Sequence, residues 1–207
     1  MKQLDALLFV FDGLSDWETG HAIAAINNPR FQRLPGRYRV RTVALHSDVV
    51  QTMGGIRIVP DLTLAQASPV ESAMLILPGG DAWESGGNQE AIEAAQSFLN
   101  AGVPVAAICA ATAALARGGL LDKRRHTSNA REYLAATGYR GQSFYEEAPA
   151  VSDDNIITAS GTAPVDFAQH IFRRLDLYPP AVLDAWHGLF KTGHREYFDA
   201  LMRAVSA

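Results

Sequence analysis

The sequence has only one cysteine, Cys109, and no long apolar run among its 207 residues. A single cysteine cannot form a disulfide within the chain, which suits a reducing compartment. No apolar stretch reaches the roughly 18 residues that a membrane-spanning helix needs. The apolar run near the start is interrupted by Asp5 and lacks a small-residue cleavage site, so we interpret it as a strand and not as a signal peptide. We therefore expect a cytoplasmic protein without a membrane partner.

Positive charge is also scarce. The chain has 18 Lys and Arg against 22 Asp and Glu, and its formal net charge is −4. Nucleic-acid binding needs clustered positive charge, and we interpret the densest basic run, Lys123-Arg124-Arg125, as a solvated turn. We expect no nucleic-acid partner. Four histidines form no pair at metal-ligand spacing with a nearby cysteine, so we expect no metal and no other cofactor: His21, His46, His170 and His187.

Apolar strand-like segments alternate with helix-like segments along the chain. The pattern predicts strands at residues 4–11, 38–45, 73–77 and 103–108, and a hairpin at 148–159. It predicts helices at residues 16–26, 89–100, 110–117, 129–137 and 165–175, and two more after Pro179-Pro180. This order is typical of a single α/β domain, here spanning residues 1–207, with a mostly parallel sheet covered on both faces.

Ligands of such sheets bind beyond the carboxyl ends of the strands. Cys109 lies at one of these ends, between the strand at 103–108 and the helix at 110–117. A sharp turn there would present the thiol as a nucleophile elbow does, and the helix N-terminus would lower the thiol pKa. The alternative is a buried, inert cysteine. Ala107 and Ala111 occupy the positions where elbows usually have glycine. The motif alone therefore does not decide between a nucleophile and an inert cysteine.

Two further strand ends carry candidate partners of Cys109. The backbone N–H groups of Gly79, Gly80 and Ala110 are candidates for an oxyanion hole, although Gly79-Gly80 also fits a plain turn. Glu18, if buried beside the sulfur, would favour its protonated form and serve as general acid or base. Its alternative is a surface carboxylate in the first turn of a helix. Asp81 is expected to line the entrance to the site.

Taken together, these segments resemble the ThiJ/PfpI family of the class I glutamine amidotransferase-like superfamily. The matching stretches are Leu7–Gly13 with Glu18, Leu75–Gly80, Val105–Ala110, Gly119–Leu121 and Thr158–Ala168. The resemblance implies a flavodoxin-like three-layer sandwich and a homodimer. It also implies that Cys109 is the nucleophile, that Glu18 contacts it, and that the Gly79-Gly80 loop and Ala110 surround an oxyanion.

Departures from the family pattern narrow the expected activity. Intracellular peptidases of the family carry His after the cysteine and isocyanide hydratases usually carry Thr, whereas this chain has Ala110. That form resembles the human parkinsonism-linked branch, whose histidine follows the Gly-Leu-Leu segment. His126 matches that position and is our candidate base, with a surface loop histidine as the alternative. Trp17 and Trp83 flank the site, either as pocket walls or as ordinary packing.

The late string His194-Arg195-Glu196 resembles the His-x-Glu pair of true glutaminases, but it falls in an amphipathic segment and is expected on a helix surface. We therefore expect neither glutaminase nor peptidase activity. The leading hypothesis is a cysteine-dependent hydrolase or lyase-like enzyme acting on a small carbonyl or amide electrophile, in the manner of a glyoxalase, deglycase or amidase. The alternative is a non-enzymatic redox or stress-response protein that works through oxidation of Cys109.

Overall fold

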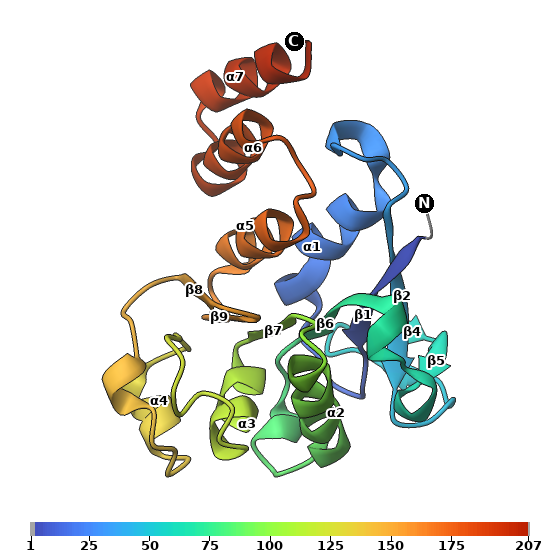
Figure 1. Cartoon of the computed structure of the whole chain (residues 1–207), viewed down its shortest axis with the longest axis vertical. Coiled ribbons are helices and arrows are strands. Elements are labelled where there is room, and N and C mark those ends of the chain that lie inside the picture. The colour runs from blue at the N-terminus through green and yellow to red at the C-terminus, as the bar shows by residue number, and fades with distance from the viewer. Residues whose placement is uncertain (1–2, 207) are drawn as a thin grey trace.

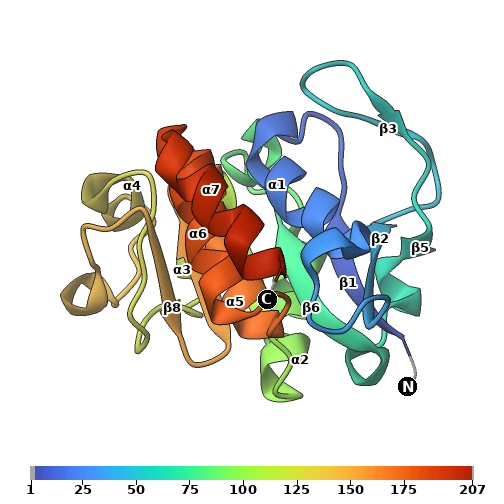
Figure 2. The ribbon, with the colours of Figure 1, turned by 90° about the horizontal axis from the view of Figure 1, so that it is seen from above.

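The computed structural model describes residues 3–206 and is built on a seven-stranded sheet of order β5-β2-β1-β6-β7-β9-β8. Its strands are β1 Leu4–Phe9, β2 Tyr38–Ala44, β5 Leu62–Thr63, β6 Ser72–Leu77, β7 Val105–Ile108, β8 Ala150–Asp153 and β9 Ile156–Ala159. All neighbouring strands are parallel except β8 and β9. Two short strands, β3 Val50–Gln51 and β4 Arg57–Ile58, form a separate antiparallel hairpin that projects beside α1 (Figure 2).

Helices cover both faces of the sheet, so the expected three-layer sandwich is confirmed (Figure 1). The helices are α1 Asp16–Asn27, α2 Gln89–Asn100, α3 Ala110–Arg117, α4 Arg131–Ala135, α5 Pro164–Leu175, α6 Pro180–Thr192 and α7 Arg195–Ser206. The 3-10 turns are η1 Pro29–Phe31, η2 Leu64–Gln66, η3 Pro69–Glu71, η4 Asp81–Trp83 and η5 Gln142–Phe144. α1 and α5 lie on one face, α2 and α3 lie on the other, and α6 and α7 stack outward from α5.

The central strands form because their apolar runs are buried on both faces, as a doubly covered parallel sheet requires. Leu75 of β6 lies opposite Leu7 of β1 and Val105 of β7, and all three are at most 1% exposed. β1 ends at Phe9, two residues earlier than the apolar run suggests. The continuous apolar segment therefore extends beyond the sheet and carries Phe11 into the packing around the strand ends.

The short helix α4 begins two residues later than the sequence pattern predicts. It starts at Arg131 with Ala130 as its N-cap, so Asn129, the first residue of the predicted helix, lies outside it. The side chain of Asn129 instead bonds to Cys109 and to the backbone of Gly161. A side chain that bonds elsewhere cannot satisfy the first N–H groups of a helix, so the helix starts later.

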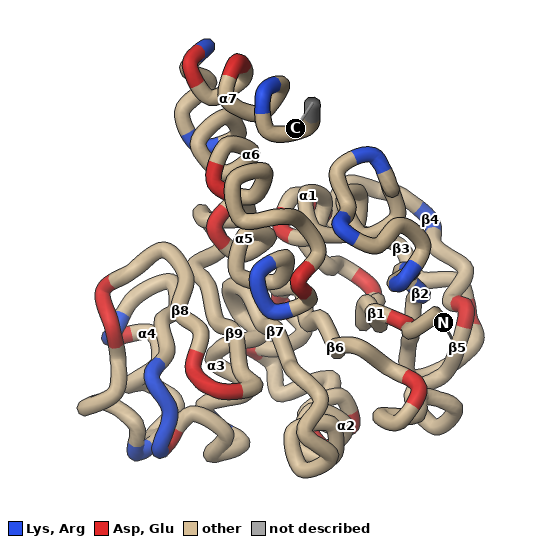
Figure 3. The backbone as a smooth tube through the Cα atoms, turned by 45° about the horizontal axis from the view of Figure 1, so that its top comes forward, with Lys and Arg blue, Asp and Glu red and all other residues tan. Residues whose placement is uncertain are grey.

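Lys and Arg positions are interspersed with Asp and Glu positions along the backbone in the view of Figure 3. In the predicted basic turn, Arg125 forms ion pairs with Glu146 and Asp153 at 3.4 and 3.6 Å. Within residues 3–206, no helix is both long enough and apolar enough to cross a membrane.

Candidate active site

The carboxyl ends of β1, β6, β7 and β9 meet at one edge of the sheet. The chain order reverses between β1 and β6, because β2 pairs with β1 on one side and β6 pairs with it on the other. Such a switch point leaves a crevice between the loops that leave the two strands. These loops, the first turn of α1 and the segment before α4 carry the side chains described below.

Cys109 occupies a strained turn between β7 and α3. Its backbone has φ 59° and ψ −128°, a region that non-glycine residues rarely adopt. The Cys109 N–H donates to Ala159 O at 3.0 Å, and its carbonyl oxygen accepts from the Thr112 hydroxyl at 2.6 Å. Ala107 and Ala111 are fully buried around the turn. This is the elbow conformation that exposes a nucleophile above a sheet.

Glu18 is completely buried beside this elbow. Its Oε2 accepts a hydrogen bond from the Gly79 N–H at 2.5 Å, whereas Oε1 is enclosed and has no hydrogen-bond partner among the described residues. Burial raises the pKa of the Glu18 carboxyl, and the Gly79 N–H and the nearby Cys109 thiol offset part of that rise. A side chain at Gly79 would place its Cβ 2.7 Å from Cys109 Cβ and 2.8 Å from Glu18 Oε1. Only glycine fits between the two groups.

The thiol of Cys109 is less acidic than its place at a helix N-terminus predicts. The pKa of the thiol is raised to about 11, chiefly by burial; a hydrogen bond from Asn129 lowers it, a charge on Glu18 raises it, and the Ala110 N–H lowers it. The expectation of a lowered pKa is therefore wrong, because loss of hydration outweighs the helix N-terminus. Since Gly79 donates to Glu18, the N–H groups of Gly80 and Ala110 are the remaining candidates for an oxyanion site.

Two residues beyond the predicted site, Asn129 and Gly161, lie close to the sulfur. Asn129 donates from Nδ2 to Cys109 Sγ at 3.3 Å and accepts from the Gly161 N–H at 2.8 Å. A Cβ at Gly161 would lie 2.8 Å from Sγ. Gly161 follows β9, so the rule that sites gather at carboxyl strand ends was a usable signal for it. Asn129 gave no such signal, because the pattern predicted it as the first residue of a helix.

His126 lies away from the sulfur, in a buried aromatic cluster. Its Nδ1 is 2.6 Å from the Arg124 carbonyl oxygen and its Nε2 is 3.0 Å from the Tyr139 hydroxyl. A carbonyl oxygen only accepts, so Nδ1 carries the proton and Nε2 accepts from Tyr139. Burial lowers the pKa of His126 and favours this neutral form. Both nitrogens are therefore occupied, and the side chain of this segment that reaches Cys109 is Asn129.

The two tryptophans have different roles. Trp83 is 1% exposed and packs on Phe9 and Phe11, so it belongs to the core. Trp17 is 53% exposed and donates from Nε1 to the Gly161 carbonyl oxygen at 3.1 Å, which places it at the rim of the site.

Asp81 is the exposed first residue of η4. Tyr133 donates to Glu84 at 2.9 Å and so joins α4 to the loop after η4. Burial, Glu84 and Cys109, in that order, raise the pKa of Tyr133. His194 and Glu196 lie exposed at the start of α7, with side chains 68% and 73% accessible. Across the described part of the chain, no three acidic, histidine or cysteine side chains are grouped as a metal site.

This geometry defines a class: a flavodoxin-like α/β sandwich with a cysteine elbow and a buried glutamate at the sheet's switch point. The sequence model of the DJ-1/PfpI family matches residues 5–174, so the chain belongs to that family and the resemblance to ThiJ/PfpI proteins is confirmed. The crystal structure of a thiJ/pfpI family protein from Bacillus anthracis is 42% identical, with a TM-score of 0.92 over 100% of this chain and 99% of that one.

Relatives in the family carry different activity names. A Bacillus subtilis protein named uncharacterized protease YoaZ is 39% identical over 209 residues, which cover all of both chains. Deglycase PfpI from Pyrococcus furiosus is 34% identical over 92 residues, or 44% of this chain and 55% of that protein. The relatives thus carry the names of two different activities, protease and deglycase.

Proposed function

We propose that this protein is a cysteine-dependent enzyme that acts on a small carbonyl or amide electrophile in the cytoplasm, where reducing conditions keep a lone thiol free. The observation that carries the proposal is the pairing of Cys109 with the enclosed, unpartnered Oε1 of Glu18. An unpartnered carboxylate oxygen beside a thiol is an acceptor for the thiol proton. Burial raises the pKa of the Glu18 carboxyl, which makes it a stronger proton acceptor than an exposed glutamate.

The reaction begins as Cys109 Sγ bonds to the electrophilic carbon and its proton passes to Glu18 Oε1. The carbonyl π electrons move to oxygen, and the N–H groups of Gly80 and Ala110 stabilise the resulting oxyanion. With an amide, Glu18 returns the proton to the leaving amine and a thioester remains; with a 2-oxoaldehyde, the hemithioacetal rearranges by proton transfer to a thioester. A water molecule then adds to the thioester carbon, one of its protons passes to the sulfur as the carbon–sulfur bond breaks, and the carboxylic acid product leaves. The enzyme regains its thiol, so no oxidant, reductant or cofactor is consumed.

Crowding around the sulfur favours a small substrate. Gly79 and Gly161 each lie so close that an added Cβ would fall within 2.7–2.8 Å of Cys109 atoms, and Trp17 closes part of the rim. His126 is occupied elsewhere, so the site lacks a histidine base for amide leaving groups from that segment. These features, with the deglycase name of one relative, favour aldehyde-type substrates over peptides.

A redox role for Cys109 is the second candidate, and the half-buried position of the only thiol supports it. A protonated Glu18 would donate to a sulfinate oxygen. The raised thiol pKa disfavours this role, because peroxide oxidises thiolates much faster than thiols. After mild peroxide, a mass increase of about 32 Da at Cys109 would favour it.

Cys109→Ser tests the enzyme proposal on methylglyoxal and on a panel of small amides. We expect turnover to fall by about 10³-fold or more, because a hydroxyl in this site is a far weaker nucleophile than a thiol. Ser85→Ala, an exposed position near η4, is the matched control and should retain full activity. Wild-type protein without turnover on every substrate of the panel, or an active Cys109→Ser variant, would contradict the proposal.

A further inference from the structure

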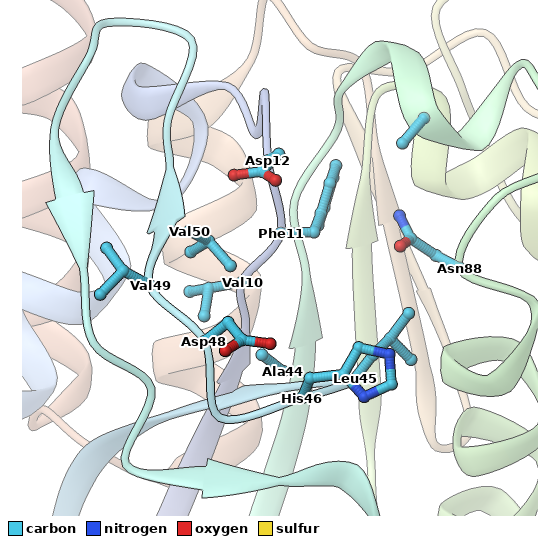
Figure 4. A pocket seen from close by; sticks show the side chains of 11 residues that line it. Val10, Phe11, Asp12, Ala44, Leu45, His46, Asp48, Val49, Val50 and Asn88 are labelled. Atoms are coloured by element: carbon cyan, nitrogen blue, oxygen red, sulfur yellow. The ribbon is translucent and has the colours of Figure 1, made fainter.

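A second cavity lies at the carboxyl ends of β1 and β2. It has a volume of about 320 Å³. It is lined by residues at the ends of both strands, in the loop that leads into β3 and in the loop before α2 (Figure 4). Phe11 lines this cavity and packs on the Gly80 loop and on Trp83, whose ring centroid is 5.5 Å away. None of Glu18, Gly80 and Cys109 lines the cavity. The cavity is therefore separate from the site described above.

The polar groups at this cavity are mainly acceptors. Asp12 and Asp48 both line it, and neither is in an ion pair among the described residues. Asp12 Oδ1 accepts from the Gln51 N–H at 2.7 Å, which fixes the carboxylate in place. His46 is the only basic side chain among the lining residues, which include no lysine or arginine. This charge balance repels anions and attracts cations.

Asn88 gives independent support for a bound ligand. It precedes α2 in the left-handed conformation, with φ 58°, yet its side chain makes no cap hydrogen bond. It is 9% exposed, and its Nδ2 is enclosed without any partner in the described chain. Figure 4 shows its amide directed toward Phe11, across the cavity from Val49 and Val50. Burying an unpaired amide costs free energy that a ligand's polar group would recover.

We propose that this cavity binds a small organic amine that carries a second polar group. Its ammonium group lies between Asp12 and Asp48, its apolar body packs on Phe11 and the neighbouring valines, and its second polar group bonds to the Asn88 amide. The ring of Phe11 adds cation–π or stacking attraction. The cavity volume is at the lower end for ligand sites, which limits the ligand to a size near that of tyramine.

Isothermal titration calorimetry of the full chain with tyramine tests the proposal, with tyrosol as the neutral analogue and 3-(4-hydroxyphenyl)propionate as the anionic one. We expect saturable 1:1 binding of tyramine, binding of tyrosol that is weaker by about tenfold or more, and no binding of the anion. Asp48→Asn should weaken tyramine about tenfold, and Asn88→Leu should weaken tyramine more than it weakens phenethylamine, which lacks the hydroxyl group.

Asp184→Asn is the matched control, because it removes an exposed carboxylate on α6, on the other side of the sheet. It should leave the affinity unchanged. The Cys109→Ser variant should also bind tyramine normally, which separates this proposal from the enzyme proposal. Failure of tyramine to bind, equal affinity for tyrosol, or an unchanged affinity in a folded Asp48→Asn variant would overturn the proposal.

Discussion

Opposing effects act on the sulfur of Cys109. Burial raises the thiol pKa, and the donors on Asn129 and Ala110 lower it. The titrations of Glu18 and Cys109 are coupled: a negative charge on Glu18 raises the pKa of the thiol, and protonation of Glu18 removes that effect. A thiol that stays neutral at rest and loses its proton to Glu18 during attack is consistent with these directions. The reactivity of Cys109 therefore depends on how the proton is shared between the thiol and Glu18.

Glu18→Gln isolates that charge. The glutamine carbonyl can still accept from the Gly79 N–H, and its amide NH₂ would face the sulfur. We expect the Cys109 pKa to fall below the wild-type value of about 11, because a negative charge is replaced by a donor, while turnover is lost with the base. Iodoacetamide alkylation rates measured against pH give the pKa. An identical pH profile in both proteins, with the exposed Glu90→Gln as control, would show that Glu18 does not act on the thiol.

Asn129→Ala removes the donor to Sγ and the acceptor of the Gly161 N–H together. We expect the thiol pKa to rise and kcat to fall by about tenfold, which corresponds to the loss of one hydrogen bond to a charged group. Asn100→Ala, at an exposed position of α2, should change neither quantity. Stopped-flow alkylation and steady-state kinetics would measure both. A variant with normal pKa and kcat would reduce Asn129 to a structural residue.

At the scale of elements, the loop after β9 closes the site. Gly161 bonds to Asn129 through its N–H and to Trp17 through its carbonyl oxygen, so it joins the segment before α4 to α1 across the sulfur. Its closeness to Sγ leaves no room for a side chain. The loop therefore sets how much space a substrate has above Cys109.

Gly161→Ala tests this constraint. The added methyl would lie 2.8 Å from Sγ, so we expect the loop to shift, stability to fall by about 1–3 kcal/mol and kcat/KM to fall by at least about tenfold. Gly20→Ala is the control, because no atom lies within 4 Å of its added Cβ in α1 and alanine favours helix by about 1 kcal/mol. Urea unfolding and kinetics on both variants provide the measurement. Full activity in Gly161→Ala would show that the loop moves freely.

Elements were more predictable than the contacts between them. Continuous apolar runs identified β1, β6 and β7 because both faces of these strands are buried, and the strand-end rule placed Cys109 and the Gly79-Gly80 loop at one edge. The sequence did not predict which side chain of this segment reaches the sulfur. His126 was the candidate, but the path of the chain between residues 126 and 129 brings Asn129 there instead. Local periodicity does not encode the path of such a turn, which depends on buried bonds such as that between Thr112 and Ser128 at 2.6 Å.

At the scale of the whole molecule, α5 links the sheet beside the Cys109 site to the outer helices α6 and α7. It packs against α1, the sheet and α6, and it carries the buried Asp166 and the partly buried His170. Asp166 pairs with His187 and Lys191 of α6 at 3.1 and 2.6 Å, and His170 bonds to Ser152 of β8 at 2.6 Å. The homodimer implied by the family resemblance stays a prediction. The free energy of unfolding of the protein is expected to depend on pH through the partly buried His170.

Burial, with a smaller contribution from Arg173, lowers the pKa of His170 to about 4. In the unfolded chain its pKa is near ~6.5, so between these values the unfolded state binds a proton that the folded state does not. The free energy of unfolding is therefore unaffected by His170 above about pH 6.5 and falls as the pH drops toward 4, by at most about 3 kcal/mol. The lowered pKa of the buried His126 adds in the same direction.

His170→Asn should flatten this dependence while keeping an acceptor for the Ser152 hydroxyl. Relative to wild type, the variant should lose stability more slowly between about pH 6.5 and pH 4.5, and the two curves should run parallel at higher pH. Urea denaturation at a series of pH values gives both curves. His194→Asn, whose parent side chain is 68% exposed, should follow wild type throughout. Parallel curves for wild type and His170→Asn across the whole range would contradict this prediction. They would show that His170 has the same pKa in the folded and the unfolded protein, and so that its side chain is hydrated in the folded state.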